Sequence, residues 1–362
     1  MLSALQPSAA ARACRVLIVD NSAVARLVFK RIVSESCRFT VVEQAASAQD
    51  ALDKLAQIEV DLILLDIEMP GMTGIEAIPH LRERSGGVPI LIVSALCKKN
   101  TEASVRAMTM GASDTILKPL SAATKAGFAI ELEAAMTRLW DARFDAAEGP
   151  AQSPLEILRR PLPSSVRAPV NCLAIGASTG GLHALAKFFD ALPREIDMPI
   201  LVTQHLPAEF VGYFAAQMKI RTGRDVVVAQ HGEKLRRGAM LIAPGGANLT
   251  VKESGDAAKV HLDVLQPGSR LHGSVDAMLA SVAKVYRKSA IGVILSGMGR
   301  DGVKGAVDLV GCGGEILVQD KDSAVIWGMP GAAVDRGVAT RVASPVELAA
   351  QIAERARTFG WG

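Results

Sequence analysis

The stretch Cys172-Leu-Ala-Ile-Gly176-Ala-Ser178-Thr179-Gly180-Gly181 places an apolar run before a glycine-rich turn and an amphipathic segment. This order predicts a buried strand that ends in a sharp turn and continues into a helix. The turn fits the pattern Gly-x-Ser-x-Gly, whose small neighbours leave the serine oxygen exposed to a carbonyl group. A glycine-rich turn of this kind can equally cradle a phosphate, so both interpretations are open on this stretch alone.

Strand-like and helix-like segments alternate on both sides of this turn. Downstream, apolar runs predict strands at residues 172–175, 200–202, 226–228, 240–242, 291–295 and 315–318, with helices after residues 181, 207 and 302 and across 275–287. Upstream, strands are expected at 16–19, 40–43, 61–65, 89–93 and 115–117, and a last helix at about 121–143. Such alternation is typical of parallel α/β sheets with helices on both faces.

The chain is predicted to hold two such domains. Its 362 residues exceed one ordinary core and suit two. Residues 145–168 lose the alternation and gather prolines, which favours a linker. We therefore expect a five-stranded parallel (βα)5 domain at residues 15–144 and a doubly wound, mainly parallel α/β domain at residues 169–362.

Composition narrows the classes of protein to which the chain can belong. Hydrophobic residues at 49% and charged residues at 21% exclude a disordered chain. A net charge of +3 without long runs of like charge argues against nucleic-acid binding. The five scattered cysteines argue against a disulfide framework and a structural zinc site. With no signal-peptide pattern and no run of about eighteen apolar residues, we expect a cytoplasmic protein without membrane insertion.

Two further strand ends carry the partners that a serine nucleophile needs, a base and a carboxylate that orients the base. His205 comes at the end of the predicted strand at 200–202, which we expect to lie beside the strand that precedes Ser178. A dinucleotide-binding site would need an acidic residue at this strand end to hold the ribose. Asp301 lies in the glycine-rich turn 297–302 after another strand, although an aspartate there can also cap a helix. The order Ser, His, Asp differs from that of the α/β-hydrolases and implies another fold.

Polar side chains also follow the strands of the first predicted domain. At the carboxyl ends of its strands, where parallel sheets bind ligands, stand Asp20, Asn21, Asp66, Ser94 and Lys118. Taken singly, each is an ordinary turn or cap residue. Together they predict a pocket with oxygen ligands for Mg²⁺ and with a hydroxyl and an ammonium group for an acyl phosphate.

The first domain resembles a two-component receiver domain, with Leu64-Leu-Asp66-Ile-Glu68-Met-Pro-Gly71 as its phospho-acceptor loop. The resemblance implies that Asp66 is phosphorylated. It assigns Mg²⁺ binding to Asp20, Asn21, Asp66 and the backbone carbonyl of Glu68, the switch hydroxyl to Ser94, and pairing with the phosphoryl group to Lys118. Receivers usually carry a second acidic residue where Asn21 stands, so weaker Mg²⁺ binding is expected.

The second domain resembles the catalytic domain of the chemotaxis protein-glutamate methylesterases, the CheB family. The resemblance rests on residues 175–181, Gln204-His-Leu-Pro207, the 297–302 turn and Gly328-Met-Pro330. The order of a receiver followed by a hydrolase is itself a feature of that family. Residues 169–362 are therefore expected to form a doubly wound, mainly parallel α/β hydrolase domain of CheB type.

Membership of this family would make the chain a phosphorylation-activated serine hydrolase. Ser178 would attack the γ-carbonyl of a glutamyl methyl ester, His205 would transfer the proton, and Asp301 would orient the imidazole. The backbone N–H of Met298 would bind the oxyanion, with Thr179 as a supporting neighbour. The same acyl chemistry would deamidate certain glutamines, and the esterase reaction would need no cofactor.

The resemblance also implies partners and a mode of control. The expected substrates are methyl-accepting chemotaxis receptors, and the expected phosphodonor is a CheA-type histidine kinase. The unphosphorylated receiver would cover the active site until phosphorylation loosens the contact. Two alternatives are open, namely an esterase of the same family in a non-motility chemosensory pathway and a receiver-linked nucleotide-binding module.

Overall fold

The computed structural model describes residues 12–94, 98–119, 125–142, 169–255, 257–265 and 273–359. The chain divides into two compact units, Met1–Ala147 and Glu148–Gly362. The predicted linker at residues 145–168 lies outside the described residues. The domain limits of 15–144 and 169–362 therefore stay predictions.

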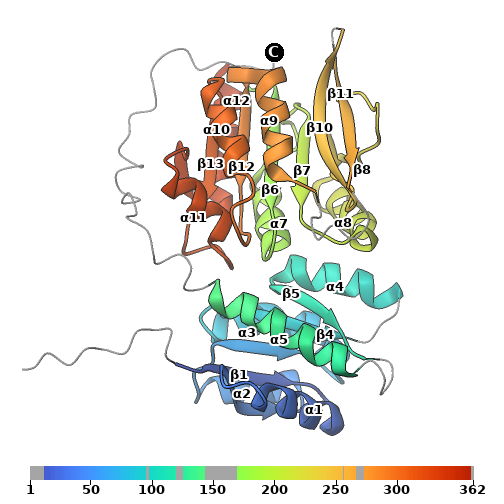
Figure 1. Ribbon diagram of the computed structural model, residues 1–362, viewed down its shortest axis with the longest axis vertical. Helices are drawn as coiled ribbons and strands as arrows, with labels where there is room; N and C mark the ends of the chain where they lie inside the picture. The colour runs from blue at the N-terminus through green and yellow to red at the C-terminus, as the bar shows by residue number, and fades with distance from the viewer. Residues whose placement is uncertain are drawn as a thin grey trace, which may run out of the picture. The chain divides into compact units, whose positions relative to one another are not determined.

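Within the described residues, the first unit holds a five-stranded parallel sheet in the order β2-β1-β3-β4-β5. Helices cover both faces of this sheet (Figure 1). The strands are β1 (Cys14–Val19), β2 (Phe39–Ala45), β3 (Leu62–Leu65), β4 (Ile90–Ser94) and β5 (Asp114–Leu117). The helices are α1 (Ala23–Ser34), α2 (Ala48–Leu55), α3 (Gly74–Arg84), α4 (Lys98–Met110) and α5 (Lys125–Asp141). The predicted (βα)5 fold is confirmed.

The central strands β3 and β4 are apolar except for Ser94, the last residue of β4. All four side chains of β3 and all five residues of β4 are buried. Continuous apolar runs of this kind fit a sheet that is covered on both faces. The polar residues that follow these strands are therefore confined to the sheet edge, where Asp20 follows β1 and Asp66 follows β3.

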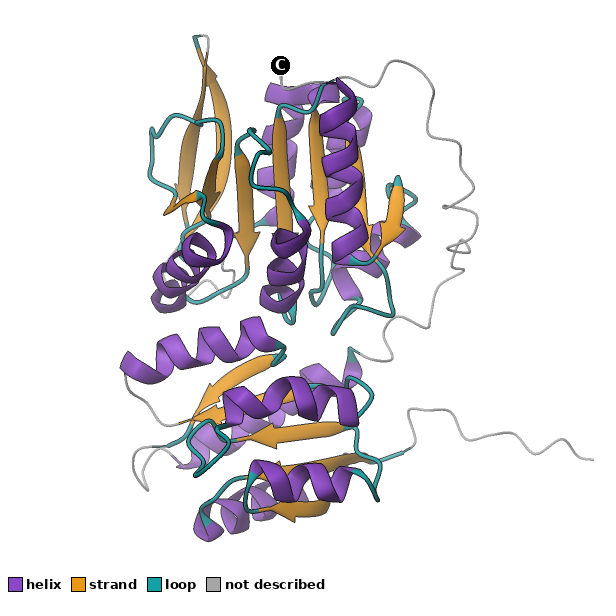
Figure 2. Ribbon diagram, turned by 180° about the vertical axis from the view of Figure 1, so that it is seen from behind, coloured by secondary structure: helices purple, strands orange, loops and turns teal. Residues whose placement is uncertain are grey.

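Within the described part of the second unit, seven strands form a parallel sheet in the order β14-β13-β12-β6-β7-β9-β8. Figure 2 shows helices on both faces of this sheet, as the doubly wound prediction requires. The strands are β6 (Cys172–Ala177), β7 (Ile200–Gln204), β8 (Asp225–Val228), β9 (Ala239–Ile242), β12 (Ala290–Ile294), β13 (Glu315–Gln319) and β14 (Arg341–Ala343). The helices are α7 (Gly181–Ala191), α8 (Ala208–Thr222), α9 (Val275–Tyr286), α10 (Val303–Gly311), α11 (Gly328–Asp335) and α12 (Pro345–Phe359). This prediction is confirmed.

Helix α9 packs closely on the sheet beside the turn that holds Ser178. Its residues Val275, Met278 and Leu279 are fully buried in the core. A Cβ atom on Gly176 would lie 2.2 Å from Val275 Cγ1, so glycine at this position lets the start of α9 approach β6. The first turn of α9 is thereby fixed next to the carboxyl end of β6.

Some elements differ from the sequence prediction. An antiparallel hairpin of β10 (Ala247–Ser254) and β11 (Ala257–Val264) is not predicted, because its half-buried strands mix polar and apolar residues and give no continuous apolar run. Strand β14 has three residues, which is too short for a pattern. Helix α5 ends at Asp141, and residues 121–124 and 143 of the expected helix lie outside the described part.

Arg287, at the end of α9, has a strained backbone with φ of 50° and ψ of −125°. We expect Arg287→Gly to raise the free energy of unfolding by about 1 kcal/mol, because relief of the left-handed strain exceeds the entropy that glycine adds to the unfolded chain. Calorimetric unfolding of the full chain measures the change. Lys288→Gly is the matched control, since Lys288 has ordinary φ and should lose stability. An Arg287→Gly variant no more stable than the parent would contradict the expectation.

Candidate active site

Three neighbouring strand ends bring the predicted hydrolase residues to one edge of the second sheet. Strands β12, β6 and β7 are adjacent and parallel. Ser178 follows β6, His205 follows β7, and Asp301 lies in the turn between β12 and α10. Because the carboxyl ends of parallel strands share an edge, the topology brings these three residues to one place.

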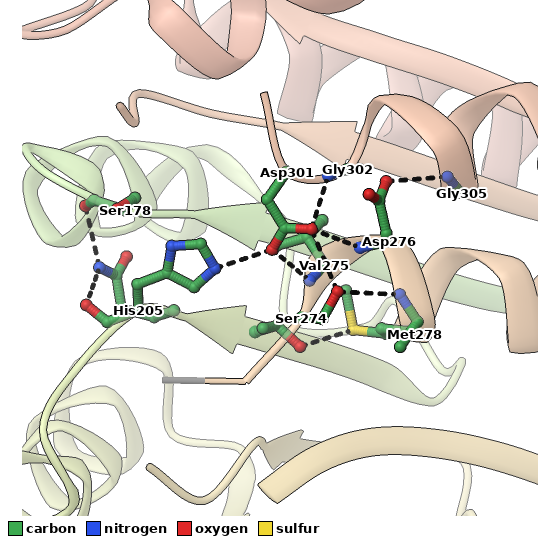
Figure 3. Close-up of polar contacts among 12 residues, drawn as sticks. Ser178, His205, Ser274, Val275, Asp276, Met278, Asp301, Gly302 and Gly305 are labelled. Carbon is green, nitrogen blue, oxygen red and sulfur yellow. Dashed lines mark hydrogen bonds and ion pairs between the residues drawn. The ribbon is translucent and has the colours of Figure 1, made fainter. Parts of the chain in front are cut away.

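His205 and Asp301 are in direct contact. His205 Nε2 lies 2.9 Å from Asp301 Oδ2 (Figure 3). Only 17% of the His205 side chain and 21% of the Asp301 side chain are exposed. A hydrogen bond in such a place is little weakened by competing water and holds the imidazole in one orientation.

The carboxylate of Asp301 is also held by the N-terminus of α9. It accepts hydrogen bonds from Val275 N–H at 2.7 Å, Asp276 N–H at 3.0 Å and Ser274 Oγ at 3.1 Å. Burial acts to raise the pKa of Asp301, but its hydrogen bonds to the imidazole and to α9 outweigh burial and lower the pKa to about 2. The carboxylate is therefore charged at neutral pH.

A charged Asp301 decides which nitrogen of His205 can act as a base. The carboxylate only accepts hydrogen bonds, so Nε2 carries the proton and Nδ1 keeps its lone pair. No hydrogen bond joins Ser178 Oγ to the imidazole within the described residues. Contacts between a nucleophile and its base are often long without substrate, so the strand-end placement still permits proton transfer from Ser178 to Nδ1.

The lowered pKa of Asp301 predicts a stability that depends on pH. A carboxyl whose pKa falls from 3.8 to about 2 on folding contributes about 2 kcal/mol above pH 4, and that contribution disappears as the pH falls through 2. Asp301→Asn removes this contribution. Denaturant unfolding between pH 2 and pH 6 should therefore show a gap between the parent and the variant that closes toward pH 2. A gap that is constant over this range would contradict the assignment.

Close contacts explain the glycines around Ser178. Gly180 has φ of +74°, and a Cβ atom there would lie 2.5 Å from Val325 Cβ. A Cβ atom on Gly297 would lie 2.8 Å from Ser178 Cβ. The Ser178 N–H donates to Ser296 O at 2.9 Å, which ties the turn to the end of β12. These contacts fix the backbone of the turn on both sides of Ser178, which is half-buried.

The backbone at Met298, the predicted oxyanion contact, is fixed by the segment that begins α11. The Gly297 N–H donates to Ile326 O at 3.1 Å, and the Met329 N–H donates to Gly297 O at 2.8 Å. A Cβ atom on Gly328 would lie 3.2 Å from Met298 Cα, so this segment lies directly against Met298. The Met298 N–H has no acceptor within the described residues and can serve an incoming oxygen.

The other histidines lie elsewhere. His80 is in α3 and His183 is in α7. The rings of His231 and His261 lie 4.8 Å apart and contact each other. His272 lies outside the described residues. Of the histidines that the structure describes, His205 alone contacts Asp301.

Sequence reasoning assigned no role to Ser274 or to the start of α9. Ser274 is the N-cap of α9, and its Oγ accepts the Ala277 N–H at 3.2 Å while contacting Asp301. A serine before an amphipathic segment signals a helix start. No pattern in the sequence says that this helix start lies beside Asp301, because that contact joins residues 27 positions apart.

In the first unit, the predicted phosphorylation residues also meet at one sheet edge. Lys118 Nζ lies 2.8 Å from Asp20 Oδ2 and 2.8 Å from Asp66 Oδ2. Both carboxylates are buried, and burial raises the pKa of Asp66 although the ammonium of Lys118 opposes the shift. Ser94 Oγ is buried at the same edge and has no hydrogen-bond partner within the described residues. A cation and a hydroxyl thus stand beside Asp66.

The residues of this cluster fit Mg²⁺ with one charge fewer than a fully acidic site. Asp20 and Asp66 both reach the same ammonium group, so their carboxylates can also reach one metal ion. Asn21 and Glu68 are exposed at the rim. The described residues contain no group of three His, Cys, Asp or Glu side chains that could hold a metal, so a Mg²⁺ ion here would also need the neutral oxygens of Asn21 and of the Glu68 backbone.

Gly74 shapes the loop after Asp66. A Cβ atom on Gly74 would lie 2.0 Å from Asp66 O, and the Gly74 N–H donates to Ile67 O at 2.9 Å. The close approach lets α3 begin against the backbone of the predicted phospho-acceptor.

Among the described helices of the chain, none is long and apolar enough to cross a bilayer.

Comparison with known proteins matches both units. The family model for the response regulator receiver domain matches residues 16–125, and the model for CheB methylesterase matches residues 173–352. The chain is 36% identical to protein-glutamate methylesterase/protein-glutamine glutaminase 1 of Paramagnetospirillum magneticum, over 95% of this chain and 96% of that protein. Protein-glutamate methylesterase/protein-glutamine glutaminase 2 of Caulobacter vibrioides is 35% identical over 95% of this chain and 99% of its own length.

The solved catalytic domain of the Thermotoga maritima CheB methylesterase is 32% identical, with a TM-score of 0.49, and covers 52% of this chain and 99% of that domain. The names of the relatives give no support to a nucleotide-binding module. Identity above 30% over nearly the whole chain, in the order receiver then esterase, shows the family. The chain belongs to the CheB family of protein-glutamate methylesterases/protein-glutamine glutaminases and is a hydrolase with a receiver domain.

Proposed function

We propose that Ser178, His205 and Asp301 catalyse the hydrolysis of glutamyl methyl esters on methyl-accepting chemotaxis receptors. The proposal rests on the 2.9 Å contact between His205 and the charged Asp301. His205 follows strand β7, which pairs with the strand that Ser178 follows. The relatives are named for the same reaction class. A cytoplasmic location is part of the proposal.

The proposed reaction proceeds through an acyl-enzyme. Ser178 Oγ attacks the ester carbon while its proton passes to His205 Nδ1, and the carbonyl oxygen becomes an oxyanion that accepts the Met298 N–H. Methanol leaves with the proton from His205. Water then attacks the acyl group, His205 takes a proton from the water, and Ser178 leaves as the hydroxyl. Asp301 stays charged and stabilises the imidazolium in both halves.

The same cycle accounts for deamidation. When the substrate is a glutamine side chain, ammonia replaces methanol as the leaving group and takes its proton from His205. The acyl-enzyme and its hydrolysis are identical in the two cases. We therefore propose both activities for one site, in keeping with the double name of the relatives.

The receiver is proposed to control this site through phosphorylation of Asp66. The residues proposed to hold Mg²⁺ are Asp20, Asn21, Asp66 and Glu68, the last through its backbone carbonyl. A bound Mg²⁺ would neutralise the phosphoryl oxygens during transfer. Lys118 would pair with the phosphoryl group and Ser94 would donate its hydroxyl to it. The proposed phosphodonor is a CheA-type histidine kinase.

Phosphorylation of Asp66 is expected despite the neutral ligand at position 21. Incubation with Mg²⁺ and a small-molecule phosphodonor should add one phosphoryl group, visible in the intact mass and absent from Asp66→Asn. Asp53→Asn, in α2, is the control and should be modified like the parent. Failure of the parent chain to be modified would overturn the proposed switch.

Methanol release from methylated receptor membranes tests the proposed activity. The intact chain should release methanol, and release should increase with phosphodonor and Mg²⁺ if phosphorylation uncovers the site. Unmethylated membranes supply the background. If no methanol above that background is released, with or without phosphodonor, the proposed substrate is refuted. If methanol is released at the same rate with and without phosphodonor, control by occlusion is refuted.

A further inference from the structure

Gln204, the last residue of β7, has a buried side chain between the Ser178 turn and His205. Only 3% of the residue is exposed. Its Nε2 donates to Ser178 O at 2.9 Å and to His205 O at 3.3 Å. Two carbonyl oxygens need a donor, so the nitrogen end of the amide must face them. One amide group thus joins the backbones of the nucleophile and the base.

The contact with Ser178 O sets the direction of the next N–H. A trans peptide is planar, and its C=O and N–H point in opposite directions. The Ser178 carbonyl is held by Gln204 and by the Gly181 N–H at 2.7 Å, so the Thr179 N–H is turned to the opposite side. The Thr179 N–H has no acceptor within the described residues.

The following peptide is held in a similar way. Ser296 Oγ, which is fully buried, lies 2.9 Å from Thr179 O and 3.1 Å from Ile326 O, the two acceptors for its one proton, and it accepts the Ile326 N–H at 3.0 Å. Both carbonyls of the turn are therefore bound by buried side chains from the strands on either side of β6. The N–H groups of these two peptides, those of Thr179 and Gly180, therefore point away from these contacts.

The glycine at position 181 makes room for this arrangement. Gly181 has no left-handed φ, so its backbone conformation does not require glycine. A Cβ atom on Gly181 would lie 2.4 Å from Gln204 Oε1. The small residue is needed because the Gln204 side chain occupies the space beside it.

A role in stability alone explains Gln204 poorly. Its Oε1 is buried and has no hydrogen-bond partner within the described residues, which is an unfavourable state for an acceptor. The Ser178 carbonyl keeps a donor from Gly181 even without Gln204. An apolar side chain of similar length would fill the space without a buried unsatisfied oxygen.

We infer that Gln204 is a positioning residue that holds the Ser178 peptide so that the Thr179 N–H acts as a second oxyanion donor beside Met298. The inference rests on the proposed role of Ser178. It goes beyond that role because it assigns the direction of the donor to a side chain that does not touch the substrate.

Replacement of Gln204 by methionine tests the inference in the full chain. We expect kcat for methyl-ester hydrolysis to fall by about 10- to 100-fold and KM to change less than about threefold. The reason is that a misplaced N–H stabilises the transition state less and affects substrate binding little. Gln204→Leu should show the same loss, because an aliphatic side chain cannot donate to either carbonyl. Thr203→Val, a buried change on the same strand, is the matched control and should keep kcat.

A second measurement separates positioning from folding. A trifluoromethyl ketone analogue of the glutamyl side chain forms a hemiketal oxyanion, so Gln204→Met should weaken its inhibition by about the factor lost in kcat. Unchanged kcat and unchanged inhibition in both folded Gln204 variants would overturn the inference. The proposed function is tested separately by Ser178→Ala. An active Ser178→Ala refutes that function, whereas an inactive one beside fully active Gln204 variants refutes only the role of Gln204.

Discussion

Ser178→Ala is expected to lower kcat for methyl-ester hydrolysis by a factor on the order of 10⁶, since removal of a serine nucleophile leaves only the catalysis due to binding and the oxyanion contacts. The fold should not change. Ser178 Oγ makes no hydrogen bond within the described residues, and the contacts of the turn come from its backbone. Methanol release from methylated receptor membranes, together with thermal unfolding, measures both properties.

The matched control for this change is Ser254→Ala, at the end of β10 in the hairpin. It should keep full activity. A Ser178→Ala enzyme that is folded and retains even about 1% of the parental kcat would be incompatible with a covalent mechanism through this residue.

His205→Ala is expected to cause a loss of nearly the same size as Ser178→Ala. The imidazole accepts the serine proton and returns it to methanol, so both halves of the reaction need it. The double variant should be no slower than either single one, because the two residues act as a unit. Added imidazole should restore part of the activity, since the truncated side chain leaves space beside the Asp301 carboxylate.

His80→Ala is the control for this prediction, because His80 lies exposed on α3 in the first unit. Its activity should equal that of the parent. Strictly additive losses in the double variant would mean that Ser178 and His205 do not act in one proton transfer.

Much of the fold could be predicted from periodicity. Apolar runs such as 62–65 and 172–177 are buried on both faces of a parallel sheet, so pattern and burial coincide. The hairpin of β10 and β11 escaped prediction because its strands are half-buried and mix polar with apolar residues. A strand that is covered on one face shows an alternation of polar and apolar residues and no continuous apolar run.

The candidate site could be predicted in part. Ser178, His205 and Asp301 each follow a strand, and strand ends are readable from the sequence. The contacts that hold these three residues in place could not be predicted from strand ends. The α9 N-terminus reaches Asp301, and Gln204 reaches Ser178, only because strands and helices far apart in sequence pack side by side.

The first unit follows the same rule. Asp20, Asp66, Ser94 and Lys118 were assigned from strand ends, and Lys118 bridges the two carboxylates at 2.8 Å. What the sequence could not give is the extent of burial of Ser94 Oγ, which depends on the surrounding packing. A phosphoryl oxygen on Asp66 would give this buried hydroxyl the hydrogen-bond partner that it lacks.

Covalent labelling identifies the nucleophile of the hydrolase. A peptide that carries a phosphonate in place of the glutamyl ester would phosphonylate the nucleophile, and peptide mass mapping would locate the adduct. We expect one adduct at Ser178, formed much more slowly in His205→Ala and not at all in Ser178→Ala. An adduct at another residue that accompanies complete loss of methyl-ester hydrolysis would contradict it.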